Sequence, residues 1–521
     1  MSPRLMFLLL MISIDVSVSY RILCIFPLHM KSHQTMFGGL IRGLVKRGHH
    51  VDEISHYPQK SSLENYRHVV NLDGTLPKLV NGISLEYANN ISSDIIEFIA
   101  GTNGNKVCEL LALDTMQKFI KDLPNGEPYD LVITEGFGAN CYMGFGKFLK
   151  VPTVVMVSLN GLPWIDSNVG NPASTAFYPN TFMRGSAPLN FWDRLTNTLN
   201  NVILKYRFER YTARQTEIMR RYISPDLPDI RVVEKDVALV LTNSHYTTNG
   251  IRPNTPAYVE VGGLHVESDD AEISEDLSKW MNESKDGVVY FTLGSMAKIE
   301  TMPREKILAF YASFAKIAPV KVLMKIWDES LLPPGLPKNV RISSWIPQVP
   351  VLAHKNTKAF ITHCGLMGTQ EALYHGVPMI GLPLFGDQHR NVRAYMAKNV
   401  LIMLPHEDVT SESMDAALKA ILRDPKYREA AKFESARFRD RPMTATNTAI
   451  FWIEYVVRNG ANSLRSLSLD LHWWQIALLD VYGFLALCTI LTCYIILLSL
   501  RIAIRICRAG TTRPDARKKL N

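Results

Sequence analysis

Residues 360–388 have the sequence FITHCGLMGTQEALYHGVPMIGLPLFGDQ, which predicts a strand, a tight turn and a helix in immediate succession. The strand is the short apolar run Lys358–Thr362, and the helix is Leu366–Tyr374, which stops at Gly376. Free amides and the positive dipole end at such a helix start favour a phosphate, and Gly365 lets the backbone approach it closely. The stretch therefore predicts an α/β fold with a phosphate-binding turn.

Polar residues after the next apolar run predict a sugar site beside that turn. Val377–Phe385 is apolar and interrupted by prolines, which fits a second buried parallel strand, and Asp387 and Gln388 follow it. Ligands of open α/β sheets bind at the carboxyl ends of the strands. A carboxylate next to an amide offers the acceptors and donors that sugar hydroxyls require, and His363 adds a further donor. The two features together indicate a nucleotide-sugar site.

The same residues resemble, nearly position by position, the donor-binding signature of the UDP-glycosyltransferase family. Its glucuronosyl and glucosyl transferases conjugate small lipophilic molecules. The resemblance implies that His363 and Gly365 meet the diphosphate and that Glu371 binds the ribose hydroxyls. By the same resemblance, Asp387 and Gln388 bind the transferred sugar.

Two upstream motifs extend the resemblance. The motif WIPQ resembles the family segment in which Trp345 stacks on uracil and Gln348 contacts the nucleoside. The motif FTLGSM resembles the loop whose Gly294 and Ser295 approach the phosphates. The chain departs from the family at Met367, where vertebrate members commonly carry asparagine. The donor site is therefore expected to draw on three separate segments.

The front half of the chain predicts a second strand–loop–helix unit. The strand is Ile22–Pro27, a loop with His29 and His33 follows, and the helix is Thr35–Arg47. Loops at strand ends are where α/β folds place chemistry. In the family that this chain resembles, the loop histidine after a serine is the general base, and Ser32-His33 occupies that place. His29 is the competing candidate.

The general base is expected to have an acidic partner. Transfer to an alcohol needs a base because a neutral hydroxyl is a poor nucleophile, and imidazole titrates near neutral pH. The family pairs its histidine with an aspartate at the end of a later strand. Here Tyr129–Glu135 resembles that strand, and Glu135 stands in the place of the aspartate. Asn140 is a rival orienting residue that carries no charge.

Length, composition and charge allow a large two-domain protein. The 521 residues, 47% of them hydrophobic, suffice for two domains of about 200 residues each plus appendages. The net charge is +8, but residues 501–521 hold seven Lys and Arg against Asp515, which contributes +6 and leaves +2 elsewhere. Because the charge belongs to the tail, nucleic acid is not an expected partner.

The domain organisation is expected to follow the family. The resemblance extends from the motif RGHHVDEIS to the membrane anchor and implies the GT-B fold, in which two Rossmann-like domains face a deep cleft. The acidic stretch after Ser268 predicts the linker between them. The predicted segments are a signal peptide (1–19), an N-terminal acceptor-binding domain (20–267), a linker (268–286), a C-terminal UDP-sugar-binding domain (287–445), a helical return segment (446–470), a transmembrane helix (481–500) and a basic cytosolic tail (501–521).

Both ends of the chain predict export and membrane anchoring. Residues 1–19 combine Arg4, an apolar run and small residues near the end, which together describe a cleavable secretory signal. Residues 481–500 carry no charge and can span a bilayer core, and positive residues follow them. This predicts a type I single-pass protein with lumenal domains. The final KKLN resembles a dilysine retrieval signal, which implies the endoplasmic reticulum membrane, unless it is merely a solvated basic tail.

The cysteines give no disulfide framework by their spacing, and no metal motif is present. Four of the seven cysteines lie on the lumenal side without close pairing, and the chain has neither CxxC nor HExxH. We therefore expect no metal. Two sequons are candidates for N-glycosylation in a lumenal chain, at Asn90 and Asn282.

The predicted function is an inverting UDP-glycosyltransferase that makes a β-glycoside. Aromatic residues crowd residues 137–192, which suits a small lipophilic acceptor. The stretch YDLVITEGFGANC looks like invertebrate members, which favours UDP-glucose, with UDP-glucuronate as the other donor. The UDP-sugar is a co-substrate, and no cofactor is expected. Whether the protein forms a homo- or hetero-oligomer stays open.

Two other functions compete with this prediction. A catalytically impaired relative would bind UDP-sugar or a hydrophobic ligand, or act as a partner subunit, and the departures at Glu135, Asn140 and Met367 keep that alternative open. A membrane scaffold is the other, although a scaffold has no need of an intact donor signature.

Overall fold

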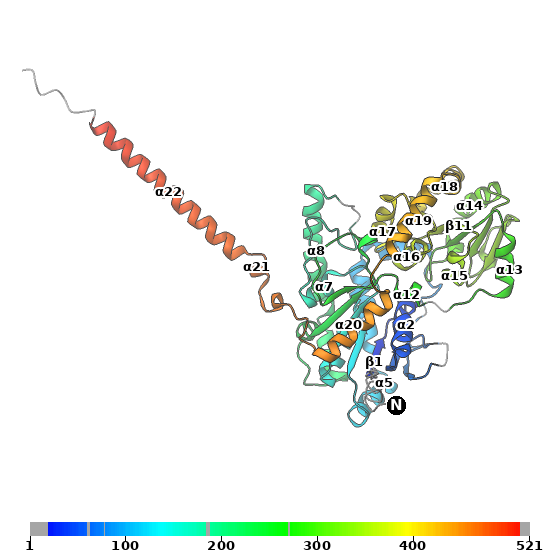
Figure 1. The fold of residues 1–521 in the computed structure, drawn as a ribbon, viewed down its shortest axis with the longest axis horizontal. Coiled ribbons are helices and arrows are strands. Elements are labelled where there is room, and N and C mark those ends of the chain that lie inside the picture. The colour runs from blue at the N-terminus through cyan, green and yellow to red at the C-terminus, as the bar shows by residue number, and fades with distance from the viewer. Residues whose placement is uncertain (1–18, 60–62, 78, 184–187, 269–270, 511–521) are drawn as a thin grey trace, which may run out of the picture. The chain divides into compact units, whose positions relative to one another are not determined.

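The computed structural model describes residues 19–59, 63–77, 79–183, 188–268 and 271–510, and Figure 1 shows their arrangement. The chain separates into two compact units, Met1–Ser466 and Leu467–Asn521. The predicted signal peptide, apart from Ser19, and the predicted dilysine signal lie outside the described residues. The larger unit contains two parallel sheets, each surrounded by helices (Figure 1).

The first sheet has seven parallel strands in the order β3-β2-β1-β4-β5-β6-β7. Its inner strands are almost entirely buried, which explains their mostly apolar sequences, because helices cover both faces of such a sheet. The strands are β1 (Arg21–Phe26), β2 (His50–Ser55), β3 (Tyr66–Asn71), β4 (Leu131–Glu135), β5 (Thr153–Val157), β6 (Val237–Thr242) and β7 (Tyr258–Glu260).

The second sheet has six parallel strands in the order β10-β9-β8-β11-β12-β13. The strands are β8 (Val288–Thr292), β9 (Lys321–Lys325), β10 (Val340–Ser343), β11 (Thr357–Thr362), β12 (Met379–Gly381) and β13 (Leu401–Met403). In both sheets the chain builds one edge first and then crosses over, so that β1 lies beside β4 and β8 lies beside β11. This is the strand order of a Rossmann-like domain, and ligands bind where the order reverses. The predicted fold class is confirmed.

Helices connect the strands in both domains. Those of the first domain are α2 (Lys31–Lys46), α3 (Leu85–Ser93), α4 (Asn105–Glu109), α5 (Asp114–Asp122), α6 (Gly144–Leu149), α7 (Pro163–Asp166), α8 (Phe191–Thr212), α9 (Gln215–Tyr222), α10 (Ile230–Glu234), α11 (Tyr246–Asn249) and α12 (Leu264–Glu267). Those of the second are α13 (Glu275–Glu283), α14 (Arg304–Lys316), α15 (Gln348–Ala353), α16 (Leu366–Tyr374), α17 (Gln388–Met396), α18 (Ser411–Arg423) and α19 (Pro425–Arg439).

The return segment packs on the first domain although it follows the second in sequence. Helix α20 (Ala445–Asn459) contributes apolar side chains to the core that contains β1 and α2. Arg47 Nε donates to Glu454 on this helix over 3.0 Å. The helix is capped by Gly460, whose φ of 88° lies in the left-handed region. The observed helix is therefore shorter than the helical return segment predicted over 446–470.

Two predicted element bounds are wrong for physical reasons. Helix α2 begins at Lys31, so His33 lies in its first turn rather than in a loop. The predicted strand Val377–Phe385 shrinks to β12, because Pro378 and Pro383 on either side have no N–H to donate to a sheet. By contrast, α16 has the predicted bounds.

The structure corrects the expectation that spacing gives no disulfide. Cys108 and Cys141 form one, with their Cα atoms 6.1 Å apart and a sequence separation of 33. Helix α4 and the short helix η4 (Asn140–Met143) pack together in the first domain and bring the two thiols into reach. Sequence spacing carries no information on this packing.

The two sequons lie on helices. Asn90 lies within α3, and Asn282 is exposed near the end of α13, where its Oδ1 is 3.3 Å from His354 Nε2. Their use as glycosylation sites stays a prediction.

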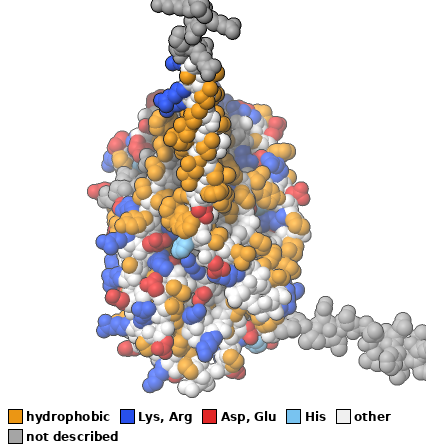
Figure 2. Space-filling model, turned by 90° about the vertical axis from the view of Figure 1, so that its left-hand side faces the viewer, with side chains coloured by type: hydrophobic (Ala, Val, Ile, Leu, Met, Phe, Trp, Pro, Cys, Tyr) orange, Lys and Arg blue, Asp and Glu red, His pale blue; other side chains and the backbone are white. Residues whose placement is uncertain are grey.

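The smaller unit consists chiefly of the helix α22 (Leu479–Gly510), preceded by the short helix α21 (Trp473–Ile476). Among the described residues, α22 is the one helix long and apolar enough to cross a membrane. Figure 2 shows the nearly continuous apolar side chains of this helix and the positive side chains near its end. It is longer than the predicted span 481–500 and supports a membrane anchor.

Candidate active site

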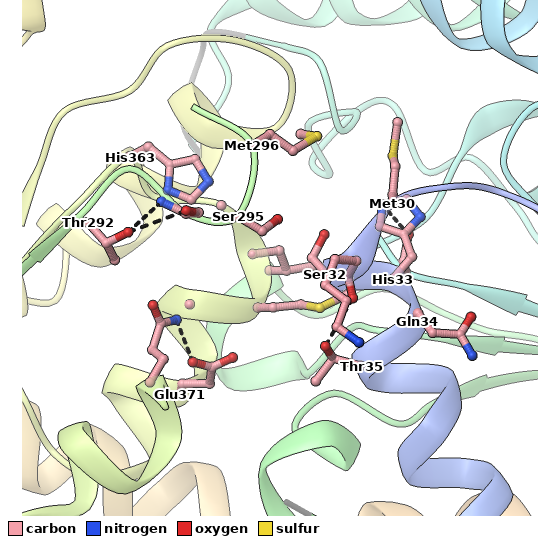
Figure 3. Close-up of a pocket in the computed structure, with 18 of the residues that line it drawn as sticks. Met30, Ser32, His33, Gln34, Thr35, Thr292, Ser295, Met296, His363 and Glu371 are labelled. Carbon is pink, nitrogen blue, oxygen red and sulfur yellow. Dashed lines mark hydrogen bonds between the residues drawn. The ribbon is translucent and has the colours of Figure 1, made fainter. Parts of the chain in front are cut away.

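A cavity of about 700 Å³ opens between the two domains of the larger unit. Its walls come from the carboxyl ends of β1 and β5 on one side and of β8 and β11 on the other. Figure 3 shows His33 and Gln34 across the cavity from His363 and Ser295. The strand order reverses at these ends in both sheets, so the cavity occupies the position expected for a ligand site.

His33 and Glu135 form a buried contact at one wall. His33 Nδ1 lies 2.5 Å from Glu135 Oε1, and both side chains are buried. The carboxylate can only accept, so Nδ1 carries the proton and donates it to Glu135. Nε2 of the neutral ring is then an acceptor, and His33 lines the cavity. The pair therefore has the geometry of a base with an orienting carboxylate.

Neighbouring groups fix the His33 ring. The edge of the ring meets Phe137, with ring centroids 5.1 Å apart, and Ser158 Oγ lies 3.1 Å from both ring nitrogens. Ser158 follows β5 and lines the same cavity. Sequence reasoning did not single out Ser158, although its position after a buried strand was an available signal.

The two rival residues lie elsewhere. Asn140 Nδ2 donates to Glu234 Oε1 over 2.6 Å, so this amide is committed to α10 rather than to His33. His29 is not among the residues that line the cavity. Burial, and then the nearby ring of His56, lower the pKa of His29 to about 4. Of the two candidate bases, His33 is the one at the cavity.

His363 follows β11 and is held between two glycines. A Cβ atom at Gly294 would lie 2.4 Å from His363 Cε1, and one at Gly365 would lie 2.6 Å from Nε2, so neither position has room for a side chain. Gly294 also has a φ of 83°, which favours glycine. Burial, and then the charge of Lys325, lower the pKa of His363 to about 4. A neutral His363 can donate one hydrogen bond to an anion in the cavity.

The start of α16 provides backbone donors. Gly365 is the N-cap of this helix and no side chain caps it, so the first amides of the helix have no partner within it. Cys364 has a φ of 67° and turns the chain sharply between β11 and α16. Gly365, Leu366, Met367 and Gly368 all line the cavity. The helix start therefore offers N–H groups and a positive dipole end to a phosphate.

A polar network lies deeper along α16. Gln348 Nε2 donates to Glu371 Oε2 over 2.5 Å, and Tyr290 Oη donates to Gln348 Oε1 over 3.2 Å. His265 Nε2 lies 3.4 Å from Glu371 Oε1. Trp345 is half-exposed and lines the cavity. The predicted nucleoside residues are thus together.

Asp387 and Gln388 line the cavity where α17 begins. Gln388 Oε1 accepts from the backbone N–H groups of Leu384 and Phe385, over 2.6 and 3.1 Å, which leaves its NH₂ group for a ligand. Asp387 Oδ2 accepts from Asn391 over 2.6 Å. Burial raises the pKa of Asp387, while the hydrogen bond from Asn391 acts in the opposite direction.

Lys325 is a cavity residue that sequence reasoning missed. It ends β9, and its Nζ donates to Gly294 O over 2.8 Å and to Asn81 Oδ1 over 2.9 Å. Nζ also lies 5.6 Å from the ring centroid of Trp345. Burial lowers the pKa of Lys325 to about 8. The available signal was a lysine at the carboxyl end of an apolar run.

Groups of three or more His, Cys, Asp or Glu side chains that could hold a metal ion are not found in the described part of the chain. On the second-domain side of the cavity, Lys325 and the start of α16 provide positive groups.

Comparisons with known proteins agree with this geometry. A family model described as UDP-glucoronosyl and UDP-glucosyl transferase matches residues 68–513. UDP-glucosyltransferase 2 of Dactylopius coccus is 33% identical over 502 residues, which cover 95% of this chain and 96% of the relative. UDP-glucuronosyltransferase 2B14 of Oryctolagus cuniculus is 33% identical over 383 residues, covering 71% of this chain and 69% of the relative.

Two solved structures have a similar fold. The structure of Phytolacca americana UGT2, complexed with UDP-2fluoro-glucose and pterostilbene, gives a TM-score of 0.57 at 15% identity and covers 84% of this chain and 100% of that one. The glycotransferase of kitacinnamycin gives a TM-score of 0.53 at 16% identity, and the match covers 84% of this chain and 99% of that one. At these identities the likeness concerns the fold alone.

Proposed function

The chain belongs to the UDP-glucuronosyl and UDP-glucosyl transferase family, and we propose that it is an inverting transferase of a hexose from a UDP-sugar to a hydroxyl of a small lipophilic acceptor. One observation carries the proposal. His33, which is paired with Glu135, lines the cavity from one domain, and His363, Gly365 and Asp387 line it from the other. A base and a diphosphate-sized anion site thus share one space.

The transfer begins with proton removal by His33. Nε2 takes the acceptor's hydroxyl proton while the hydroxyl oxygen forms a bond to the anomeric carbon of the sugar. The bond from that carbon to the UDP oxygen breaks on the opposite face, and UDP leaves with the electron pair. Glu135 keeps the ring in the productive tautomer and stabilises the imidazolium. An α-linked donor therefore gives a β-glycoside.

The leaving diphosphate gains negative charge, and the cavity has positive groups to stabilise it. These are the amides at the start of α16, the N–H of neutral His363 and the ammonium of Lys325. Because these groups already supply the stabilisation, the proposed reaction uses no metal ion. Glu371 and Gln348 would bind the ribose and uracil, with Trp345 stacked on the base.

The acceptor is expected on the first-domain side. Apolar residues line the cavity near His33 and would hold a lipophilic alcohol or phenol with its hydroxyl at Nε2, and these are Ile95, Phe98, Ile99, Phe137, Leu159 and Phe182. Such acceptors partition into bilayers, which agrees with the anchor α22.

UDP-glucose is the favoured donor, with UDP-glucuronate as the alternative. The relative named UDP-glucosyltransferase 2 aligns over 95% of this chain, whereas the relative named UDP-glucuronosyltransferase 2B14 aligns over 71%. This difference in coverage supports glucose.

Donor competition with the purified full-length chain tests the function. We expect a β-glucoside of a phenolic acceptor, identified by its anomeric proton coupling and by cleavage with β-glucosidase, and little transfer from UDP-glucuronate. A preference for UDP-glucuronate would reverse the donor assignment. UDP binding without any glycoside from a broad acceptor panel would instead identify a catalytically impaired binding protein.

We also propose that the domains are lumenal in the endoplasmic reticulum and that residues 501–521 are cytosolic. The uncharged span and the positive residues after it support this orientation. Glycosidase-sensitive modification at Asn282 and protection of the domains from protease in sealed microsomes are expected. Cleavage of the domains from outside the vesicles would contradict the orientation, and unchanged location after Lys518→Ser/Lys519→Ser would contradict the retrieval signal.

A further inference from the structure

Helix α8 has a second apolar face that points to solvent. Its inner face is buried at Asn197, Phe208 and Thr212. On its outer face, side chains at alternating spacings of three and four are each at least 40% exposed, and these are Trp192, Leu195, Leu199, Val202 and Tyr206. Phe191 and Ile203, also exposed, border this row. We call these seven residues the outer stripe.

The outer stripe is unusual for a surface in water. The 22 residues of α8 make a rod about 33 Å long, and the stripe runs along about two thirds of it. No charged residue interrupts the stripe between Leu195 and Ile203. Exposed apolar patches of this extent mark surfaces that something covers. In Figure 1, α8 lies at the edge of the larger unit, and the exposure of the stripe shows that no other described part of that unit covers it.

We propose that the outer stripe of α8 lies in the lipid surface of the membrane that α22 anchors. The covalent connection through residues 467–478 keeps the larger unit close to that bilayer, so a contact that is weak by itself is populated. Phe191, Trp192 and Tyr206 are the aromatic types that favour the lipid–water interface. Arg210 lies one turn beyond Tyr206 on the same face, where a cation can meet anionic headgroups.

The inner face of α8 connects this surface to the cavity wall. The ring of Phe208 stacks on Trp164, with the ring centroids 4.4 Å apart. Trp164 in turn stacks on Phe182, with centroids 6.3 Å apart, and Phe182 lines the cavity. Helix α8 also packs on η1 (Glu97–Gly104), whose Phe98 and Ile99 line the same wall. One helix thus separates the lipid surface from the acceptor side of the cavity. If the proposed function holds, acceptors dissolved in the bilayer have a short route to it.

Photolabelling in lipid tests the docking. The full-length chain is reconstituted in nanodiscs of phosphatidylcholine and phosphatidylserine at about four to one that contain a phospholipid with a carbene precursor in its acyl chain. Trypsin cuts after Arg194 and Lys205, so one peptide carries Leu199, Val202 and Ile203. We expect label on this peptide. Leu199→Glu/Val202→Glu should lower it at least about fivefold, with label on α22 unchanged as the internal standard.

The matched control changes the same peptide away from the stripe. Asn200→Glu/Asn201→Glu adds the same two charges outside the stripe on the helical wheel and should keep the label. No label on the wild-type peptide, or equal label in the stripe variant, would overturn the proposal. Mass photometry counts the chains in each disc. If discs that hold two chains leave this peptide unlabelled, the proposal is also overturned, because a second copy would then cover the stripe.

An activity measurement separates this proposal from the proposed function. The stripe variant should raise KM for an apolar phenol about threefold to tenfold with kcat unchanged, and leave KM for a water-soluble acceptor unchanged. Equal changes for both acceptors would contradict the lipid route. A wild-type chain that labels but does not transfer would refute the proposed function and leave the docking standing.

Discussion

His33 and Glu135 are 102 residues apart in sequence and 2.5 Å apart in the structure. Both are buried, so water screens their interaction little. Glutamate in place of the family's aspartate changes only the reach of the carboxylate, because β4 ends where the longer side chain still meets Nδ1. At the residue scale, the departure from the family pattern therefore leaves the proposed base with a charged partner.

Glu135→Gln should lower kcat about 100-fold to 1000-fold, because the amide keeps a similar shape but cannot stabilise the imidazolium. Glu135→Asp keeps the negative charge, so its kcat should fall less than that of the glutamine variant. The measurement is kcat at saturating donor and acceptor, with KM for UDP-glucose as the control, since Glu135 does not line the donor side. A glutamine variant more active than the aspartate variant would contradict the role of the charge.

Lys325 predicts a pH dependence of donor binding. Its pKa of about 8 means that the ammonium is present below that pH and is lost as pH rises through it. If the charge helps to bind the diphosphate, kcat/KM for UDP-glucose should fall above about pH 8. Lys325→Arg should remove this fall because arginine stays charged, and Lys325→Met should lower kcat/KM below about pH 8 and flatten the profile above it. An unchanged profile in the methionine variant would exclude this contribution.

At the scale of elements, strand ends position the site, and sequence pattern found most of them. Helix α16 was predicted at its observed bounds because a β-rich run, a glycine and a helix-forming run follow one another without ambiguity. The start of α2 was missed because no side chain caps it. Lys325 was missed because its contacts, Gly294 and Asn81, are distant in sequence.

Tertiary contacts explain the remaining failures. The disulfide between Cys108 and Cys141 depends on packing between two short helices that no spacing rule describes. Asn140 was a reasonable rival from sequence, but Glu234, 94 residues away, takes its amide. Periodicity reports which face of an element is buried and does not report its partner.

Gly365→Ala tests how closely α16 must approach the donor. The new Cβ would lie 2.6 Å from His363 Nε2, while the φ of −59° suits alanine, so the effect would come from contact alone. We expect Kd for UDP to rise at least about tenfold by isothermal titration. Gly126→Ala, whose nearest neighbour would be 3.7 Å away, is the control. Unchanged UDP affinity in Gly365→Ala would place the diphosphate elsewhere.

At the scale of the whole molecule, several contacts hold the two domains of the larger unit around the cavity. Asn81 N donates to Ser295 O over 2.9 Å, and Ile83 N donates to Met296 O over 3.1 Å, which ties the first domain to the loop after β8. On the other side, Gly263 N donates to Gln370 Oε1 on α16. Neither domain has a complete site by itself, because the proposed base and the donor residues come from different sheets.

The most direct test of this account is the transfer rate of His33→Ala beside that of His29→Ala, each measured on folded full-length protein with UDP-glucose and a phenolic acceptor. We expect His33→Ala to lose kcat about 1000-fold with UDP affinity unchanged, because the donor side is intact, and His29→Ala to keep its rate within about threefold. Activity that survives in His33→Ala and disappears in His29→Ala would contradict it.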